Sequence, residues 1–207
     1  MTVKDINMKD YIKSLSPNAE RRFFNEPVQF RSEEENVIEG YAAVFNKDSE
    51  DFGGWHERIA PGAFDDVLAD NAVALFNHDM NYVLGRNGVN VTLTQDERGL
   101  KYTVKLPDTT FAKDLRNLIK EGIIHQSSFA FTVKEQEWKH SDKRENPSVR
   151  TIKKIKRLYD VSPVTTPAYP DASVGARSFA ETKPKEEDQL TADVMEIEIL
   201  FKKHNLK

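Results

Sequence analysis

A chain of 207 residues is long enough for one substantial domain with extensions, since compact domains usually contain about 100–200 residues. It has no cysteine, which excludes disulfides, cysteine nucleophiles and thiolate metal sites. The net charge of −4 and the lack of a basic stripe argue against a nucleic-acid binder. Because no signal peptide or run of about 18 apolar residues is present, we expect a cytoplasmic protein that contacts other proteins and no membrane.

The beginning of the chain carries scattered apolar residues among charges and is interrupted by a Ser-Pro-Asn sequence at 16–18. This composition predicts a flexible or helical N-terminal extension over residues 1–25. From Val28 onward, apolar and polar residues alternate as far as a turn-forming cluster at 46–49, a period typical of β-strands. We therefore expect the folded domain to begin at residue 26.

The middle of the chain combines helix and strand patterns. A Pro-Gly pair at 61–62 precedes a short apolar repeat that predicts a helix, and VALFN at 73–77 predicts a buried strand. Two alternating segments, VNVTLTQ and GLKYTVKLP, meet at a turn over 96–99. This pattern predicts a β-hairpin whose apolar face includes Leu100 and Tyr102.

A second predicted helix begins after Thr109 and Thr110, which can cap it, and ends at Gly122. The segment SSFAFTV that follows returns to alternation, with its aromatic residues on one face. Ser128 is therefore expected near the start of a strand, facing away from those aromatic residues. A further strand pattern runs as far as Val164, where prolines end it.

Residues 178–207 are strongly charged and form a predicted C-terminal tail, which leaves residues 26–177 as the folded domain. An apolar stripe in this tail has the spacing of one face of an amphipathic helix. The stripe consists of Leu190, Val194, Ile197 and Phe201. A helix with a single apolar face needs a partner, so the tail is expected to dock on another protein.

Histidines are the candidates for a catalytic base. Without cysteine, covalent catalysis requires a nucleophile such as a hydroxyl, activated by a neighbouring base that is most often histidine. Of the five histidines, His56, His140 and His204 lie in predicted loops or in the tail, where solvated side chains are expected. His78 and His125 remain.

The residue types alone leave the roles of these side chains open. His78 follows a predicted buried strand, where rigid structure could hold a general base, but a structural histidine would fit the same position. Ser127 and Ser128 lie at a helix-to-strand junction, where serine ordinarily belongs to a turn. The sequence proximity of His125 to these serines does not supply the geometry that a base needs.

A metal-dependent hydrolase is another interpretation of His78, Asp79, His125 and His140. The chain contains no HxxxH or HExxH sequence, and the predicted strands do not suit an all-helical metal phosphohydrolase. We therefore expect neither a metal nor another cofactor.

Five strings stand in order along the chain: IEGYAAVFN at 38–46, ERIAPGAF at 57–64, ALFNHD at 74–79, EGIIHQSSFAF at 121–131 and LYDVSPVTTPAYPDA at 158–172. Together they resemble the prohead protease family of tailed bacteriophages, and the resemblance extends from about Arg21 to Ala176. That family is similar in fold to the herpesvirus assemblins. The resemblance therefore implies a mainly β domain with helices (α+β), in which a closed antiparallel β-barrel is surrounded by short helices.

The resemblance also implies three catalytic residues. The histidine of the family's Asn-His-Asp string falls on His78, which implies the general base, and the family's nucleophilic serine falls on Ser128, which leaves Ser127 as a neighbour. The acidic residue of the acid-Val-Ser string falls on Asp160, which implies the third member. Two positions depart from the family: Ala130 stands where glycine is usual, and Asp160 replaces glutamate.

The function implied by the resemblance is a serine endopeptidase packaged inside the phage procapsid in the host cytoplasm. It would cleave the scaffold protein or the scaffolding segment of the major capsid protein, and then itself. The similarity to assemblins adds the expectation of a homodimer. An inactive relative that guides capsid assembly by binding scaffold is the alternative function.

Overall fold

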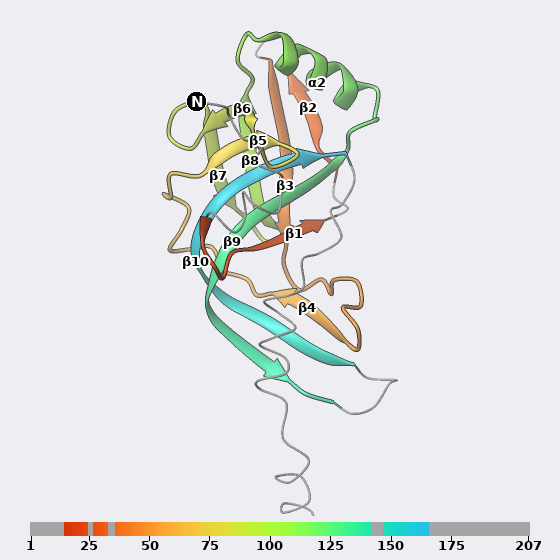
Figure 1. The fold of residues 1–207 in the computed structure, drawn as a ribbon, viewed down its shortest axis with the longest axis vertical. Helices are drawn as coiled ribbons and strands as arrows, with labels where there is room; N and C mark the ends of the chain where they lie inside the picture. The colour runs from red at the N-terminus through yellow and green to blue at the C-terminus, as the bar shows by residue number, and fades with distance from the viewer. Residues whose placement is uncertain (1–14, 25–26, 33–35, 142–146, 166–207) are drawn as a thin grey trace, which may run out of the picture. The chain divides into compact units, whose positions relative to one another are not determined.

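The computed structural model describes residues 15–24, 27–32, 36–141 and 147–165 (Figure 1). All of them belong to the first of two compact units, Met1–Val174. This described part is mainly β, and its two longest elements are the antiparallel strands β9 (Gln126–Lys139) and β10 (Ser148–Val164).

A six-stranded sheet is built around β9 and β10, which pair along most of their length (Figure 1). Its other strands are β1 (Glu20–Phe24), β4 (Trp55–Ile59), β5 (Val73–Phe76) and β6 (Asp79–Arg86). The strand order is β1-β9-β10-β5-β6. Strand β4 pairs in parallel with the N-terminal part of β10, and β5 pairs in parallel with its C-terminal part.

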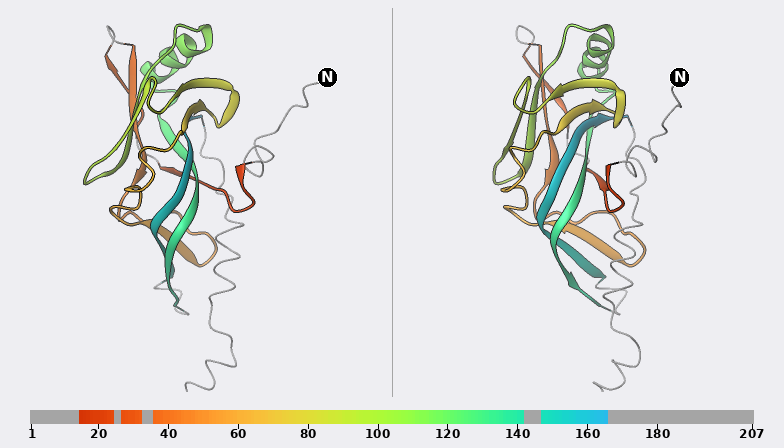
Figure 2. Two further views of the ribbon diagram at one scale, coloured as in Figure 1. Left: turned by 90° about the vertical axis from the view of Figure 1, so that its left-hand side faces the viewer. Right: turned by 60° about the vertical axis from the view of Figure 1, so that its left-hand side comes forward.

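A second sheet has four strands in the order β2-β3-β8-β7. These strands are β2 (Gln29–Ser32), β3 (Val37–Val44), β7 (Val91–Gln95) and β8 (Gly99–Lys105). The helix α2 (Thr110–Lys120) lies beside β2 in Figure 1 and in both views of Figure 2. Its first turn is capped by the Thr109 hydroxyl, which accepts a hydrogen bond from the Ala112 amide.

Residues from both sheets form the main hydrophobic core. Phe129 and Phe131 of β9 are stacked in it, with their ring centroids 4.6 Å apart, together with Leu100 of β8. Alternate residues of β9 point to the other face of the sheet, where Ala130 forms a smaller cluster with Leu75. The two faces of β9 therefore have different environments, and the apolar one anchors the strand.

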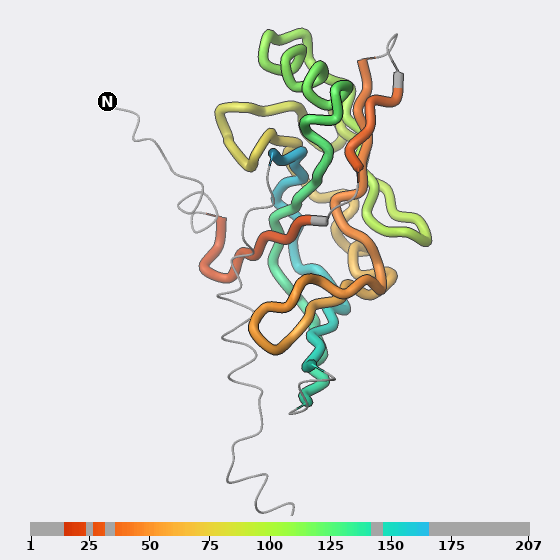
Figure 3. The backbone as a smooth tube through the Cα atoms, turned by 90° about the vertical axis from the view of Figure 1, so that its right-hand side faces the viewer, coloured from red at the N-terminus to blue at the C-terminus, as the bar shows by residue number. Residues whose placement is uncertain are grey.

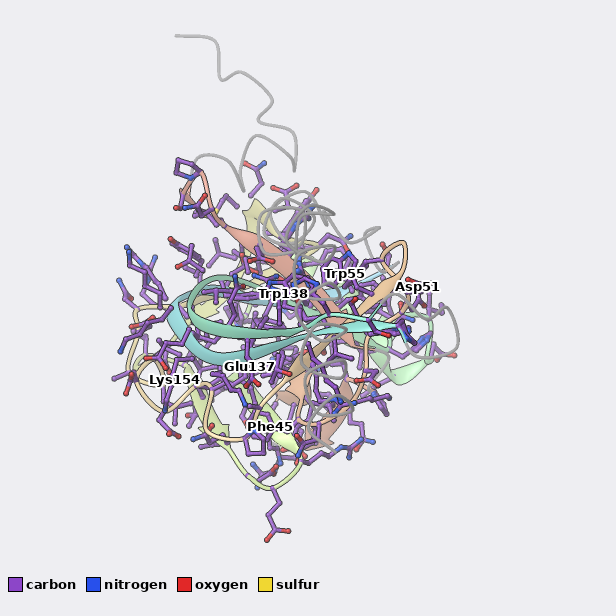
Figure 4. The ribbon with its side chains drawn as sticks, turned by 90° about the horizontal axis from the view of Figure 1, so that it is seen from below. Phe45, Asp51, Trp55, Glu137, Trp138 and Lys154 are labelled. Atoms are coloured by element: carbon purple, nitrogen blue, oxygen red, sulfur yellow. The ribbon has the colours of Figure 1, made fainter. Side chains whose placement is uncertain are left out.

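The part of β9 and β10 distant from β5 is packed against β4. Trp55 of β4 lies edge-on to Trp138 of β9, with ring centroids 5.0 Å apart and an interplanar angle of 64° (Figure 4). The loop that leads into β4 is ordered by Asp51, whose carboxylate accepts hydrogen bonds from the amides of Gly53 and Gly54. This packing fixes one end of the long hairpin.

Several predicted elements are confirmed. Strands β7 and β8 form the hairpin around the turn at 96–99, and Leu100 is fully buried. The buried strand expected at 73–77 is β5, and the helix expected after Thr109 is α2. Ser128 lies near the start of β9, as the alternation of its segment predicted.

The closed barrel and one helix require correction. Neither sheet closes on itself among the described residues, so the closed β-barrel is not confirmed. The prediction of a helix after residues 61–62 is wrong, because residues 61–69 form successive turns. The amides of Asp65 and Val67 donate to carbonyls three residues earlier, and Gly62, at φ 77°, interrupts a helical path. Within the described residues, α2 is the one complete helix.

The predicted N-terminal extension at 1–25 also needs correction. Its residues 20–24 form β1, which is stabilised by pairing with β9, more than a hundred positions further along the chain. A local pattern cannot reveal such a partner. The tail at 178–207, with its apolar stripe, and the boundary at 177 lie outside the described residues.

One negative finding concerns membranes. Over the stretches that the structure describes, α2 included, no helix combines the length and the apolar character needed to cross a lipid bilayer.

The assignment of the core predicts the effect of truncating Leu100. Leu100→Ala is expected to lower the free energy of unfolding by about 2–5 kcal/mol, because the side chain is fully buried and its loss leaves a cavity. Urea unfolding followed by tryptophan fluorescence measures this change. Val89→Ala is the control: this side chain is 80% exposed, and its truncation should change the free energy by less than about 0.5 kcal/mol. Equal effects of the two substitutions would contradict the assigned core.

Candidate active site

His78 lies in the two-residue turn between β5 and β6. Both turn residues have positive φ, 55° for Asn77 and 58° for His78, as in the tight turns that join antiparallel neighbours. This conformation costs a residue other than glycine about 1–3 kcal/mol, although asparagine and histidine adopt it more often than most residues do. Contacts to the end of β10 hold the turn: the Asn77 carboxamide oxygen accepts from the Thr165 amide at 2.9 Å, and the Asn77 amide donates to the Pro163 carbonyl at 3.0 Å.

The pairing of β9 with β10 aligns the other two predicted site residues. Ser128 lies opposite Ser162, and Ala130 lies opposite Asp160. Residues directly opposite each other in antiparallel strands point to the same face of the sheet. Ser128 and Asp160 therefore project from one face, the one that turns away from the core containing Phe129.

The structure brings His78, Ser128 and Asp160 into direct contact. Nε2 of His78 lies 2.6 Å from the Ser128 hydroxyl oxygen, and Nδ1 lies 2.5 Å from the Asp160 oxygen Oδ1. The three residues are buried, with exposed fractions of 1%, 4% and 0%, respectively. When the Nδ1 proton faces Asp160, Nε2 is free to accept the hydroxyl proton, and such an arrangement can make a serine nucleophilic.

Ser162 is a polar residue of this site that sequence reasoning missed. Its hydroxyl donates to the same Asp160 oxygen at 3.0 Å and lies 3.4 Å from Nδ1 of His78. Ser162 follows Asp160 by two positions, and alternate residues of a strand share a face. The strand pattern could therefore have indicated this partner, which holds the carboxylate in its orientation.

Ser127 makes different contacts from its neighbour Ser128. Its hydroxyl lies 2.8 Å from the Tyr102 hydroxyl, and both residues are fully buried. Burial raises the pKa of Tyr102, so its hydroxyl stays neutral. Gly40 leaves room for this pair, since a Cβ there would lie 2.9 Å from the Tyr102 oxygen. The Ser127 hydroxyl thus belongs to the packing between β8 and β9.

The Ser128 hydroxyl also contacts the N-terminal strand. Its oxygen lies 2.9 Å from the backbone carbonyl oxygen of Arg22 in β1. A serine hydroxyl has one proton, so it can donate to this carbonyl or to Nε2 of His78, but not to both. The position of β1 therefore affects which group accepts the proton of the Ser128 hydroxyl.

Four buried charged side chains connect β1 with β4 and β10. Arg22 of β1 donates to Glu57 of β4 at 2.6 and 2.9 Å and to Glu20 at 2.5 Å. Arg150 of β10 donates to Glu20 at 2.6 and 2.8 Å and to Glu57 at 2.7 Å. Two positive and two negative charges thus neutralise each other in a region that water does not reach.

This network changes the titration of Glu20. Burial alone would raise the pKa of Glu20, but the charges and hydrogen bonds of Arg22 and Arg150 outweigh burial and hold this pKa below its usual value of 4.5. A carboxylate with a lowered pKa in the folded state stabilises the fold above its unfolded-state pKa. This contribution is lost as the pH falls through the lowered value.

The other histidines of the described chain make other contacts. The ring of His56 contacts a backbone carbonyl at 2.8 Å, the exposed His125 lies 3.2 Å from the Gly122 carbonyl, and His140 stacks on Trp138. The fifth histidine lies outside the described residues. Among those that are described, no group of three or more His, Asp or Glu side chains is arranged to hold a metal ion.

A hydroxyl, an imidazole and a carboxylate in one hydrogen-bonded group are the arrangement typical of serine hydrolases. Comparison with known families narrows this class: residues 26–185, more than half of the 207-residue chain, match the model of the caudovirus prohead serine proteases. The chain therefore belongs to this family and is a phage prohead serine protease. No curated protein and no solved structure gives a significant match.

The buried network predicts a loss of stability in acid. We expect the free energy of unfolding to fall as the pH drops below about 4.5, and we expect Glu20→Gln to reduce this dependence, because Gln does not titrate. Urea unfolding curves at neutral pH and at about pH 3 measure the difference. Glu97→Gln, at an exposed position in the turn after β7, is the control and should leave the dependence unchanged. If the free energy of unfolding of the Glu20→Gln variant fell in acid by as much as that of the wild type, the role of the network would be refuted.

Proposed function

We propose that this protease hydrolyses peptide bonds with Ser128 as the nucleophile, His78 as the general base and Asp160 as the residue that orients the imidazole. The observation that carries the proposal is the pair of contacts that His78 makes, 2.6 Å to Ser128 and 2.5 Å to Asp160. The three residues come from β9, a strained turn and β10, yet their functional atoms meet at hydrogen-bond distances. Membership in a serine protease family supports the same roles.

In the proposed reaction, Nε2 of His78 accepts the Ser128 proton while the hydroxyl oxygen attacks the substrate carbonyl carbon. Asp160 stabilises the positive charge that the imidazole then carries. The ring gives this proton to the leaving amine, and an acyl ester of Ser128 remains. Water then attacks the ester, with His78 again accepting and returning a proton, and the Ser128 hydroxyl is restored.

The two departures from the family pattern are compatible with this chemistry. Asp160 is shorter than glutamate by one methylene group, but its oxygen still reaches Nδ1 of His78, and Ser162 donates to the same oxygen. Ala130 lies opposite Asp160 and is fully buried. It adds one methyl group to the face that carries Ser128 and removes no reacting group.

We further propose that the enzyme acts inside the procapsid in the host cytoplasm. Its substrates there are the scaffold protein or the scaffolding segment of the major capsid protein, and then the protease itself. Membership in a prohead protease family supports capsid-related substrates. Chain ends and exposed loop tips are the preferred sites of proteolysis, which supports the proposal that the protease also cleaves itself. Formation of a homodimer stays a prediction.

The assignment of the nucleophile predicts the behaviour of two adjacent serine variants. Ser128→Ala is expected to abolish cleavage of coexpressed capsid protein and of the protease itself, with kcat reduced by about 10⁶-fold as in other serine proteases. Ser127→Ala is the matched control, because it removes a hydroxyl one residue away that is bound to Tyr102. It should lower stability by about 1 kcal/mol and leave cleavage intact. Gels and intact-mass measurements of the coexpressed proteins report both results.

Continued processing by Ser128→Ala would rule out the proposed nucleophile. If wild type, Ser128→Ala and Ser127→Ala all left the capsid protein uncut, the alternative of an inactive assembly module would be favoured.

Two substitutions test how His78 is oriented. Asp160→Asn is expected to reduce kcat by about 10⁴-fold, because a neutral amide no longer selects the imidazole tautomer that accepts at Nε2. Ser162→Ala removes one hydrogen bond to Asp160, and a loss of about 1 kcal/mol corresponds to about a fivefold lower kcat. Steady-state kinetics should give an unchanged KM for both. A wild-type kcat for Asp160→Asn would exclude the orienting role.

A further inference from the structure

Strand β1 covers the site at Ser128. It pairs antiparallel with β9, with Phe23 opposite Ser128 and Arg22 opposite Phe129, and Figure 3 shows the two strands side by side. The Arg22 carbonyl oxygen lies 2.9 Å from the Ser128 hydroxyl oxygen, and Ser128 is only 4% exposed. A protein substrate cannot reach this hydroxyl while β1 stays in place.

The edge of β9 that β1 occupies is the edge a substrate strand requires. Extended peptides bind proteins by adding a strand to a sheet edge, where main-chain hydrogen bonds hold them. At Ser128 the other edge of β9 is paired with β10, since Ser162 lies directly opposite. A peptide that pairs with β9 beside the nucleophile therefore needs the position that β1 takes in this structure.

The contact with Arg22 also opposes activation of the nucleophile. While the Ser128 proton is donated to the Arg22 carbonyl, it is not available to Nε2 of His78. The carbonyl oxygen also lies 2.9 Å from the hydroxyl oxygen that has to approach a substrate carbonyl carbon. Thus β1 blocks both the approach of a substrate and the transfer of the proton.

We propose that β1 is an inhibitory strand that occupies the substrate's place on β9 and keeps the protease latent until it is displaced. This inference rests on the proposed nucleophile and adds the regulation of the same site. The ligand that replaces β1 is an extended peptide that pairs with residues 127–131 of β9.

The buried ion pairs of β1 are arranged so that the strand can be displaced without leaving a partner charge unpaired. Glu20 and Arg22 hold β1 to Arg150 of β10 and Glu57 of β4 through ion pairs of 2.6 Å each. After release, Glu20 and Arg22 are hydrated, while Glu57 and Arg150 still bind each other at 2.7 Å. Displacement of β1 therefore leaves no buried charge without a partner in this network.

The first test weakens the attachment of β1 in the full-length protein. The double variant Glu20→Gln/Arg22→Met removes one charge of each sign and leaves Glu57 paired with Arg150. The probe is a small fluorophosphonate that reacts with activated serines, so no knowledge of the cleavage site is needed. We expect the double variant to be labelled at Ser128 at least about tenfold faster than the wild type, because the reaction rate follows the fraction of molecules with an open site.

The matched control removes an exposed ion pair from the same long hairpin. Glu137→Gln/Lys153→Met eliminates a contact of 3.0 Å between two side chains that are 66% and 46% exposed. It should be labelled at the wild-type rate. Labelling of the β1 double variant at that same rate would overturn the proposal.

A synthetic peptide tests whether the vacated edge accepts a strand. The peptide has the sequence of residues 18–26, NAERRFFNE, and is added to the β1 double variant. It is expected to slow labelling in a saturable way, whereas a scrambled peptide of equal composition is expected to have no effect. Equal behaviour of the two peptides would argue against pairing with β9.

Hydrogen exchange of the wild-type protein provides a test that does not depend on the folding of a variant. Amides of residues 20–24 are expected to exchange through openings that occur more often than those of residues 158–162 in β10. Equal protection of the two segments would make β1 a permanent part of the sheet and refute the proposal. If no variant is labelled at Ser128, the proposed nucleophile is wrong, and the exchange result still decides whether β1 is displaceable.

Discussion

The pairing register of β9 and β10 is the constraint on which the site depends. It sets Ser128 opposite Ser162 and Ala130 opposite Asp160, so a hydroxyl and a carboxylate project from the same face of the sheet. A slip of one residue in either strand would turn one of these side chains into the core. Phe129 and Phe131 oppose such a slip, because their burial between the sheets fixes which face of β9 is apolar.

His78, the proposed base, reaches this face from a turn whose geometry is locally unfavourable. His78 adopts a positive φ that a histidine rarely takes, and contacts of the neighbouring Asn77 with the end of β10 hold it there. The same β10 carries Asp160, so one strand positions both the carboxylate and the turn. On the opposite edge of β9, β1 lies against Ser128. The site is thus assembled and covered by strands of a single sheet.

Patterns with a short range were predictable from the sequence. The hairpin of β7 and β8, the cap of α2 at Thr109 and the orientation of Ser128 away from the aromatic residues of β9 follow from alternation, turn residues and capping. Residue types alone did not unite His78 with Ser128; a resemblance across five motifs indicated that pair, and the 2.6 Å distance agrees with it. The contact of the Arg22 carbonyl with the Ser128 hydroxyl could not be predicted, because a backbone carbonyl has no sequence signature. Strand β1 was missed, because its charged residues are buried only by partners on distant strands.

The central claim is that the Ser128 oxygen bonds covalently to the substrate. The most direct measurement is the mass of the protease, quenched with acid while it cleaves the capsid protein and then digested to locate any adduct. The account predicts a transient increase equal to the N-terminal product fragment, attached at Ser128. An adduct located on any other residue would contradict it.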